Sequence, residues 1–126
     1  EVIECIEGGR DVTDGCDLSD NTVYITSGGS VLYNAMDAIG GFQFSVDGAT
    51  VNSASGGDAI AAGFVISISP SGNGIVLGFS FTGATMPSGC GTLVILELDG
   101  EATGLSGITV SGAVGANLYF EYYEFS

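Results

Sequence analysis

Four aspartates near the N-terminus are the residues whose spacing most suggests chemistry. Asp11, Asp14, Asp17 and Asp20 recur at every third position around Gly15. Calcium takes about six to eight oxygen ligands from carboxylates and carbonyls on a flexible loop, and a turn at Gly15 would gather some of these side chains. The ligands of the EF-hand loop recur at every second position instead. The series therefore predicts either a calcium site or a solvated acidic segment.

The sequence offers little for catalysis. It contains no histidine, so it cannot build a Ser-His-Asp or Cys-His nucleophile or a His-ligated zinc site. Glu97 with Asp99 or Glu101 could supply the acid and base of a glycosidase. Such enzymes hold two carboxyl groups about 5–10 Å apart across a deep cleft, for which a small domain with short loops has little room. We expect a protein that is not an enzyme.

The charge balance restricts the possible partners. The 126 residues include 15 acidic side chains and one basic side chain, Arg10, which gives a formal net charge of -14. A chain with a single basic residue cannot neutralise a run of phosphates, so nucleic-acid binding through the phosphate backbone is excluded. No apolar run reaches the roughly 18 residues of a membrane span. Because the chain starts at Glu1 rather than Met, we expect a processed product or an excerpt of a longer protein.

The three cysteines are Cys5, Cys16 and Cys90. In an acidic, lysine-free β-type sequence they favour an oxidising compartment, which places the protein outside the cell or at the cell surface. Cys16 and Cys90 both lie in turn-like contexts and are the favoured disulfide pair, closing a loop worth roughly 4–5 kcal/mol. The competing pair Cys5–Cys16 closes a short loop worth about 3 kcal/mol, and loop entropy alone cannot decide between them. The remaining cysteine suggests an intermolecular bridge or an unpaired thiol.

Two segments differ in character. Glu1 to Asn21 holds seven of the 15 acidic residues and two of the three cysteines, and we interpret residues 1–21 as an acidic arm or capping segment. From residue 22 to residue 126 short apolar runs alternate with Gly, Asn, Asp and Ser, which is typical of an all-β sandwich or barrel. The one modest helical candidate is Asp58–Ala62, which is too short to stand alone. The predicted strands are Thr22–Thr26, Ser30–Asn34, Ile39–Val46, Thr50–Ser53, Gly63–Ser69, Ile75–Thr82, Thr92–Leu98, Leu105–Ser111 and Asn117–Phe125.

The apolar residues recur with period two, as strands require. In Gly41–Val46 the side chains of Phe42, Phe44 and Val46 share one face. In the segment from Ile75 to Thr82 one face is shared by Ile75, Leu77, Phe79 and Phe81. A helix would need spacings of three and four. The pattern predicts pleated sheet along most of the chain.

The C-terminal segment is rich in aromatic residues. An exposed hydrophobic strand at a sheet edge invites pairing with another chain, by β-augmentation or donor-strand exchange. We therefore predict a partner-binding role for this segment. An ordinary core strand and a tyrosine platform for sugars are the alternatives. The residues concerned are Tyr119, Phe120, Tyr122, Tyr123 and Phe125.

Four runs carry a resemblance to a known family: Ile39–Val46, Gly63–Ser69, Val76–Phe81 and Pro87–Leu93, the last with the turn Gly-Cys-Gly-Thr-Leu. Their spacing resembles that of cohesin-like β-sandwich modules, over roughly residues 21–123. The resemblance implies a single-domain antiparallel jelly-roll sandwich of about nine strands without catalytic residues. It also implies a scaffold, adhesion or assembly role in secreted and surface proteins, some of them carried on virions.

Together these observations predict a non-enzymatic extracellular structural module, a subunit or repeat of a filament, appendage or surface structure. Copies would form a homo-oligomer or polymer through edge strands, helped by disulfides. One alternative is an adhesion module that binds a protein or glycan with the help of calcium. Another is a virion decoration or fibre protein. None of these roles requires a cofactor, and calcium is the one metal that the sequence suggests.

Overall fold

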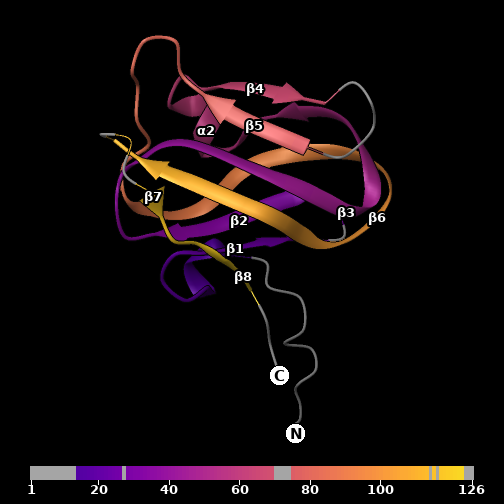
Figure 1. Ribbon diagram of the computed structural model, residues 1–126. Coiled ribbons are helices and arrows are strands. Elements are labelled where there is room, and N and C mark those ends of the chain that lie inside the picture. The colour runs from indigo at the N-terminus through magenta and orange to yellow at the C-terminus, as the bar shows by residue number, and fades with distance from the viewer. Residues whose placement is uncertain (1–13, 27, 70–74, 114, 116, 124–126) are drawn as a thin grey trace, which may run out of the picture.

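In the part of the chain that the structure describes, the backbone forms a single β-sheet with one short helix and one 3-10 turn (Figure 1). The computed structural model describes residues 14–26, 28–69, 75–113, 115 and 117–123. The prediction of an all-β fold is confirmed for this part of the chain. In chain order the elements are η2 (Gly15–Asp17), β1 (Thr22–Ile25), β2 (Ser30–Ala35), β3 (Ile39–Ser55), α2 (Gly57–Ala61), β4 (Val65–Ile68), β5 (Ile75–Phe79), β6 (Gly89–Gly112), β7 (Asn117–Leu118) and β8 (Glu121–Tyr122).

The strands follow the order β4-β5-β3-β6-β2-β1-β8, and β7 pairs with β6 beside that path. Every pairing is antiparallel except that of β1 with β8, which is parallel. The first part of β6 pairs with β2, and the rest of β6 pairs with β3. The two long strands β3 and β6 therefore form the spine of the sheet, and β4 and β8 lie at its ends.

Two predicted turns are β-bulges inside long strands, so the expectation of nine separate strands is wrong. β3 contains both Ile39–Val46 and Thr50–Ser53, and β6 contains both Thr92–Leu98 and Leu105–Ser111. The register shifts between Asp47 and Ala49, where Gly48 has φ +89°. The extra residues lie on β6, between Gly100 and Gly104. Positive φ at Gly48 and Gly100 lets both strands bend there without ending.

The C-terminal prediction also needs correction, because Asn117–Phe125 is not one strand. β7 pairs with β6 through Val110 and Leu118, and β8 then pairs with β1 at the end of the strand order. The chain thus leaves one strand and joins another after two residues. The modest helical candidate at Asp58–Ala62 does form a short helix, α2, one position earlier in the chain.

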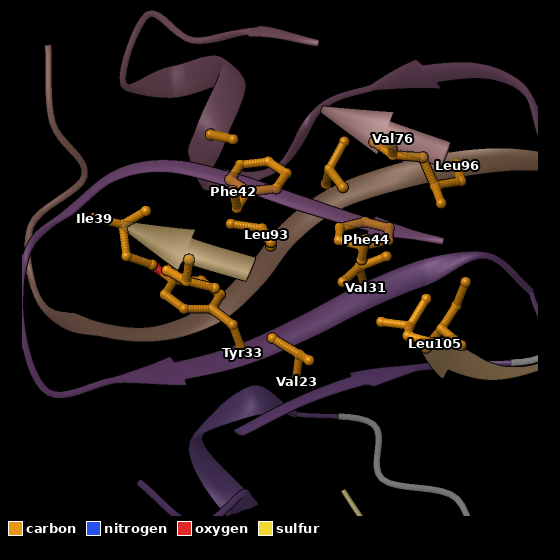
Figure 2. Close-up of a cluster of buried hydrophobic side chains, with 14 of the residues drawn as sticks. Val23, Val31, Tyr33, Ile39, Phe42, Phe44, Val76, Leu93, Leu96 and Leu105 are labelled. Carbon is orange, nitrogen blue, oxygen red and sulfur yellow. The ribbon is translucent and has the colours of Figure 1, made fainter. Parts of the chain in front are cut away.

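One hydrophobic core receives side chains from both ends of the strand order (Figure 2). Val23 and Val31 come from β1 and β2, Phe44 from β3, Val76 from β5 and Leu96 from β6. Strands as far apart in the order as β1 and β5 can share a core only because the sheet curls around it. Burying a side chain of this size contributes about 1.5–3 kcal/mol, so this cluster is the main source of stability.

The face of β5 that carries Leu77 and Phe79 does not point into the core, although it is the more apolar face of the strand. Val76 is fully buried, and Gly78 leaves room for the ring of Phe42, which a Cβ at Gly78 would overlap. Leu77 and Phe81 are 38% and 81% exposed. The smaller residues point inward because the Phe42 ring already fills that space, so the more apolar face of β5 is directed outward.

The disulfide joins Cys16 to Cys90, the pair that the sequence favours, with the Cα atoms 4.9 Å apart. It ties the η2 turn to the first residues of β6. A Cβ at Gly15 would collide with the carbonyl oxygens of Gly91 and Tyr33, so only glycine allows this close approach. Residues 14–21 therefore cap the sheet, whereas Cys5 and the rest of the arm lie outside the described residues.

Removing the disulfide by replacing both Cys16 and Cys90 with Ser should lower the free energy of unfolding by about 4–5 kcal/mol, because the bond closes a long loop in the unfolded chain. Urea unfolding followed by circular dichroism measures the change. Cys5→Ser is the matched control and should unfold at the wild-type urea concentration. An unchanged midpoint in the double variant, or a Cys5–Cys16 peptide in non-reducing mass mapping, would contradict this pairing.

Candidate functional site

The predicted calcium ligands are only partly within the described residues. Asp14 caps the η2 turn, where its Oδ1 accepts a hydrogen bond of 2.9 Å from the backbone N–H of Cys16. Asp17 and Asp20 are exposed, and Asp11 lies outside the described part. Within that part no three His, Cys, Asp or Glu side chains are close enough to hold a metal ion. The observed role of Asp14 is therefore helix capping, and calcium binding by the complete series stays a prediction.

The predicted partner-binding aromatics do not share one surface. Tyr119 is 81% exposed, whereas Phe120 and Tyr122 are partly buried against the main core. Tyr123 packs edge-on against Tyr24 with ring centroids 5.5 Å apart, and contacts a second small cluster of buried side chains. Phe125 lies outside the described residues. Of the described aromatics in this segment, Tyr119 is the one presented to solvent.

Beside this segment a polar hollow of about 520 Å³ lies where β8 meets β1. Two backbone bonds hold the segment there: the N–H of Glu121 donates to Asn21 O at 3.1 Å, and the N–H of Tyr123 donates to Val23 O at 2.8 Å. Hydroxyls, one carboxylate and tyrosine rings suit a hydroxylated ligand such as a sugar. The lining residues are Ser19, Thr22, Glu121, Tyr122 and Tyr123.

A second hollow, of about 380 Å³, contains a pair that sequence reasoning missed. The buried hydroxyl of Tyr33 on β2 donates a hydrogen bond of 2.8 Å to Asp58 Oδ2 on α2. Burial, the hydrogen bond and the charge of Asp58 all raise the pKa of Tyr33 well above its ordinary value. The pair therefore holds a neutral phenol against a carboxylate and ties α2 to the sheet. Nothing in the local sequence signals it, since the two residues are 25 positions apart.

The outward face of β4 and β5 is apolar. Val65 and Leu77 are 41% and 38% exposed, and Phe81, just beyond β5, contacts Phe79 edge-on with ring centroids 5.0 Å apart. A shallow hollow of about 270 Å³ adjoins this face, lined in part by Leu77, Phe79 and Gln43. A surface of this kind, next to the end of a sheet, is characteristic of a contact with another protein.

Comparisons of this chain with protein-family models, with curated proteins and with solved structures find no match. The resemblance to cohesin-like modules therefore stays an expectation. No helix in the described part of the chain is long and apolar enough to cross a membrane. The function must be argued from the geometry of the sheet and its surfaces.

The Tyr33–Asp58 pair predicts a specific loss of stability at alkaline pH. Because folding raises the pKa of Tyr33 above its ordinary value of 10.0, the stabilisation is complete below pH 10 and is lost as the pH rises through the folded-state pKa. Tyr33→Phe should lower the free energy of unfolding by about 0.5–1.5 kcal/mol at neutral pH. Above pH 10 the free energy of unfolding of this variant should fall less with rising pH than that of the wild type. Denaturant unfolding at neutral and alkaline pH measures both effects. Equal alkaline losses in the two proteins would contradict the assignment.

Proposed function

We propose that this chain is a non-enzymatic, extracellular building block, a subunit or repeat of a filament, appendage or surface structure. Copies join by adding strands at the ends of the sheet. The observation that carries the proposal is that, among the described residues, the sheet ends at β4 and at β8 and these two strands do not pair with each other. Unpaired backbone groups at a sheet edge are a template for a strand from another chain.

At the β8 end the sheet is closed by a minimal pairing. β8 opposes only Thr22 and Val23 of β1, and it runs parallel, an arrangement slightly less stable per residue than an antiparallel one. Two residues before β8 the exposed ring of Tyr119 offers an apolar contact to a neighbour. A strand of a second copy could extend the sheet here, as the aromatic segment predicts.

At the other end β4 has β5 as its one neighbour within the described residues. It is four residues long and contains no charge and no proline. Charged residues and prolines at edges are devices by which proteins prevent edge-to-edge pairing. β4 lacks both, which supports a role in pairing.

The compartment and the finer architecture are part of the same proposal. A disulfide between Cys16 and Cys90 is compatible with an oxidising, extracellular location. The shared core between β1–β2 and β3–β5 is what a two-layer sandwich of the jelly-roll or cohesin-like type requires.

The assembly role predicts self-association that depends on the C-terminal aromatic segment. Tyr119→Ser removes an exposed aromatic contact without disturbing the core, and should weaken association by about tenfold, equivalent to about 1.4 kcal/mol. Tyr119→Phe keeps the ring and is the matched control. Size-exclusion chromatography with light scattering, together with negative-stain electron microscopy, measures the assembly state.

A strictly monomeric protein, unchanged by deletion of Tyr119–Ser126, would contradict the assembly role. A monomer that binds sugars on a glycan array, with binding lost in Glu121→Gln, would instead favour an adhesion module that uses the polar hollow beside β8. The neighbouring genes would distinguish a virion fibre from a cellular filament, since both use the same fold.

A further inference from the structure

β4 and β5 come from an uncharged stretch of a highly acidic chain. From Ala59 to Leu96 the sequence contains no charged residue, although the chain as a whole has a formal net charge of -14. This stretch supplies β4, β5 and the first part of β6. Figure 1 shows β4 at the rim of the sheet, with β5 between it and the long strands.

The register fixes which backbone groups of β4 face outward. Ser67 pairs with Leu77 of β5, and the N–H of Ser69 donates to Ile75 O at 3.0 Å. Residues of an antiparallel strand alternate between those that exchange hydrogen bonds with a neighbour and those that do not. Ser67 and Ser69 therefore direct their backbone groups to β5, and Ile66 and Ile68 direct theirs to the open edge.

Electrostatics indicates what can occupy this edge. Two copies of this chain repel each other over their acidic surfaces, and the repulsion is weakest where neither copy carries charge. A cationic partner would be attracted to the carboxylates on other surfaces rather than to the stretch from Ala59 to Leu96. A second copy is thus the partner that fits an edge without charge and with an apolar flank.

We propose that two copies pair β4 with β4 in antiparallel orientation about a two-fold axis at Ser67. In this register Ile66 of each copy lies opposite Ile68 of the other. These are the residues whose backbone groups point to the open edge, so each such pair exchanges backbone hydrogen bonds. The outward side chains of Val65 and Leu77 then form one apolar strip across the joint with those of the second copy. The inference rests on the proposed assembly role, and it names the partner and register at one edge.

The register places Ser67 directly opposite the partner's Ser67. Residues at a position without hydrogen bonds lie about 4.5 Å apart between Cα atoms, within the range of about 4.4–6.8 Å that a disulfide spans. Ser67→Cys, in a Cys5→Ser background, should therefore form a covalent dimer under mild oxidation. Thr103→Cys in the same background is the control, because Thr103 is exposed on β6 away from the joint. Non-reducing electrophoresis over time, with mass mapping of the linked peptide, compares the two.

A second pair of variants tests the same joint without cross-linking. Ser67→Asp places two carboxylates across the axis and should abolish dimers in light scattering, whereas Ser67→Thr retains them. The β4 joint would be overturned if Ser67→Cys cross-links no faster than Thr103→Cys while the wild-type protein still assembles. The proposed function would then remain standing. A wild type that is monomeric at every concentration would overturn both.

Discussion

The near absence of basic side chains that could pair with the carboxylates constrains this structure more than any other feature. Arg10 is the single basic side chain in the sequence, against 15 acidic ones, so ion pairing can contribute almost nothing to the fold. Apolar burial, backbone pairing and the Cys16–Cys90 bond must hold the sheet together. The carboxylates repel one another, and a net charge far from zero destabilises a compact state while keeping copies apart in solution. Any contact between copies therefore has to avoid the acidic surfaces.

The curled sheet places the surface proposed for contact between copies apart from the acidic segments that repel one another. β4 and β5, which come from the stretch without charge, form one end of the strand order. At the opposite end the chain returns to cover β1 with β8, over two residues. A molecule with two different incompletely closed edges can bind one neighbour at each. A two-fold joint at β4 alone gives a closed pair, and combined with a second contact at β8 it would build a larger assembly.

Local pattern predicted much of this fold. Alternation along β3 identified Phe42, Phe44 and Val46 as one face, and all three are buried. Glycine-containing turns around the two cysteines favoured the disulfide that forms. The bulge at Gly48 was mistaken for a turn, because a glycine with positive φ occurs both in turns between strands and in bulges within a strand. The local sequence does not distinguish the two. The outward face of β5 and the Tyr33–Asp58 pair depend on which elements pack together, and periodicity within one strand carries no information about that.

The response of self-association to salt tests the central claim most directly. If copies meet over an uncharged, apolar surface and are otherwise repelled, raising NaCl from about 0.02 to 0.5 M shortens the Debye length and should strengthen association. Sedimentation velocity of the wild-type protein across that range would show the sedimentation coefficient rising toward that of the assembled form. A sedimentation coefficient that falls with salt, as for oppositely charged surfaces, or a monomer at every salt concentration, would contradict the account.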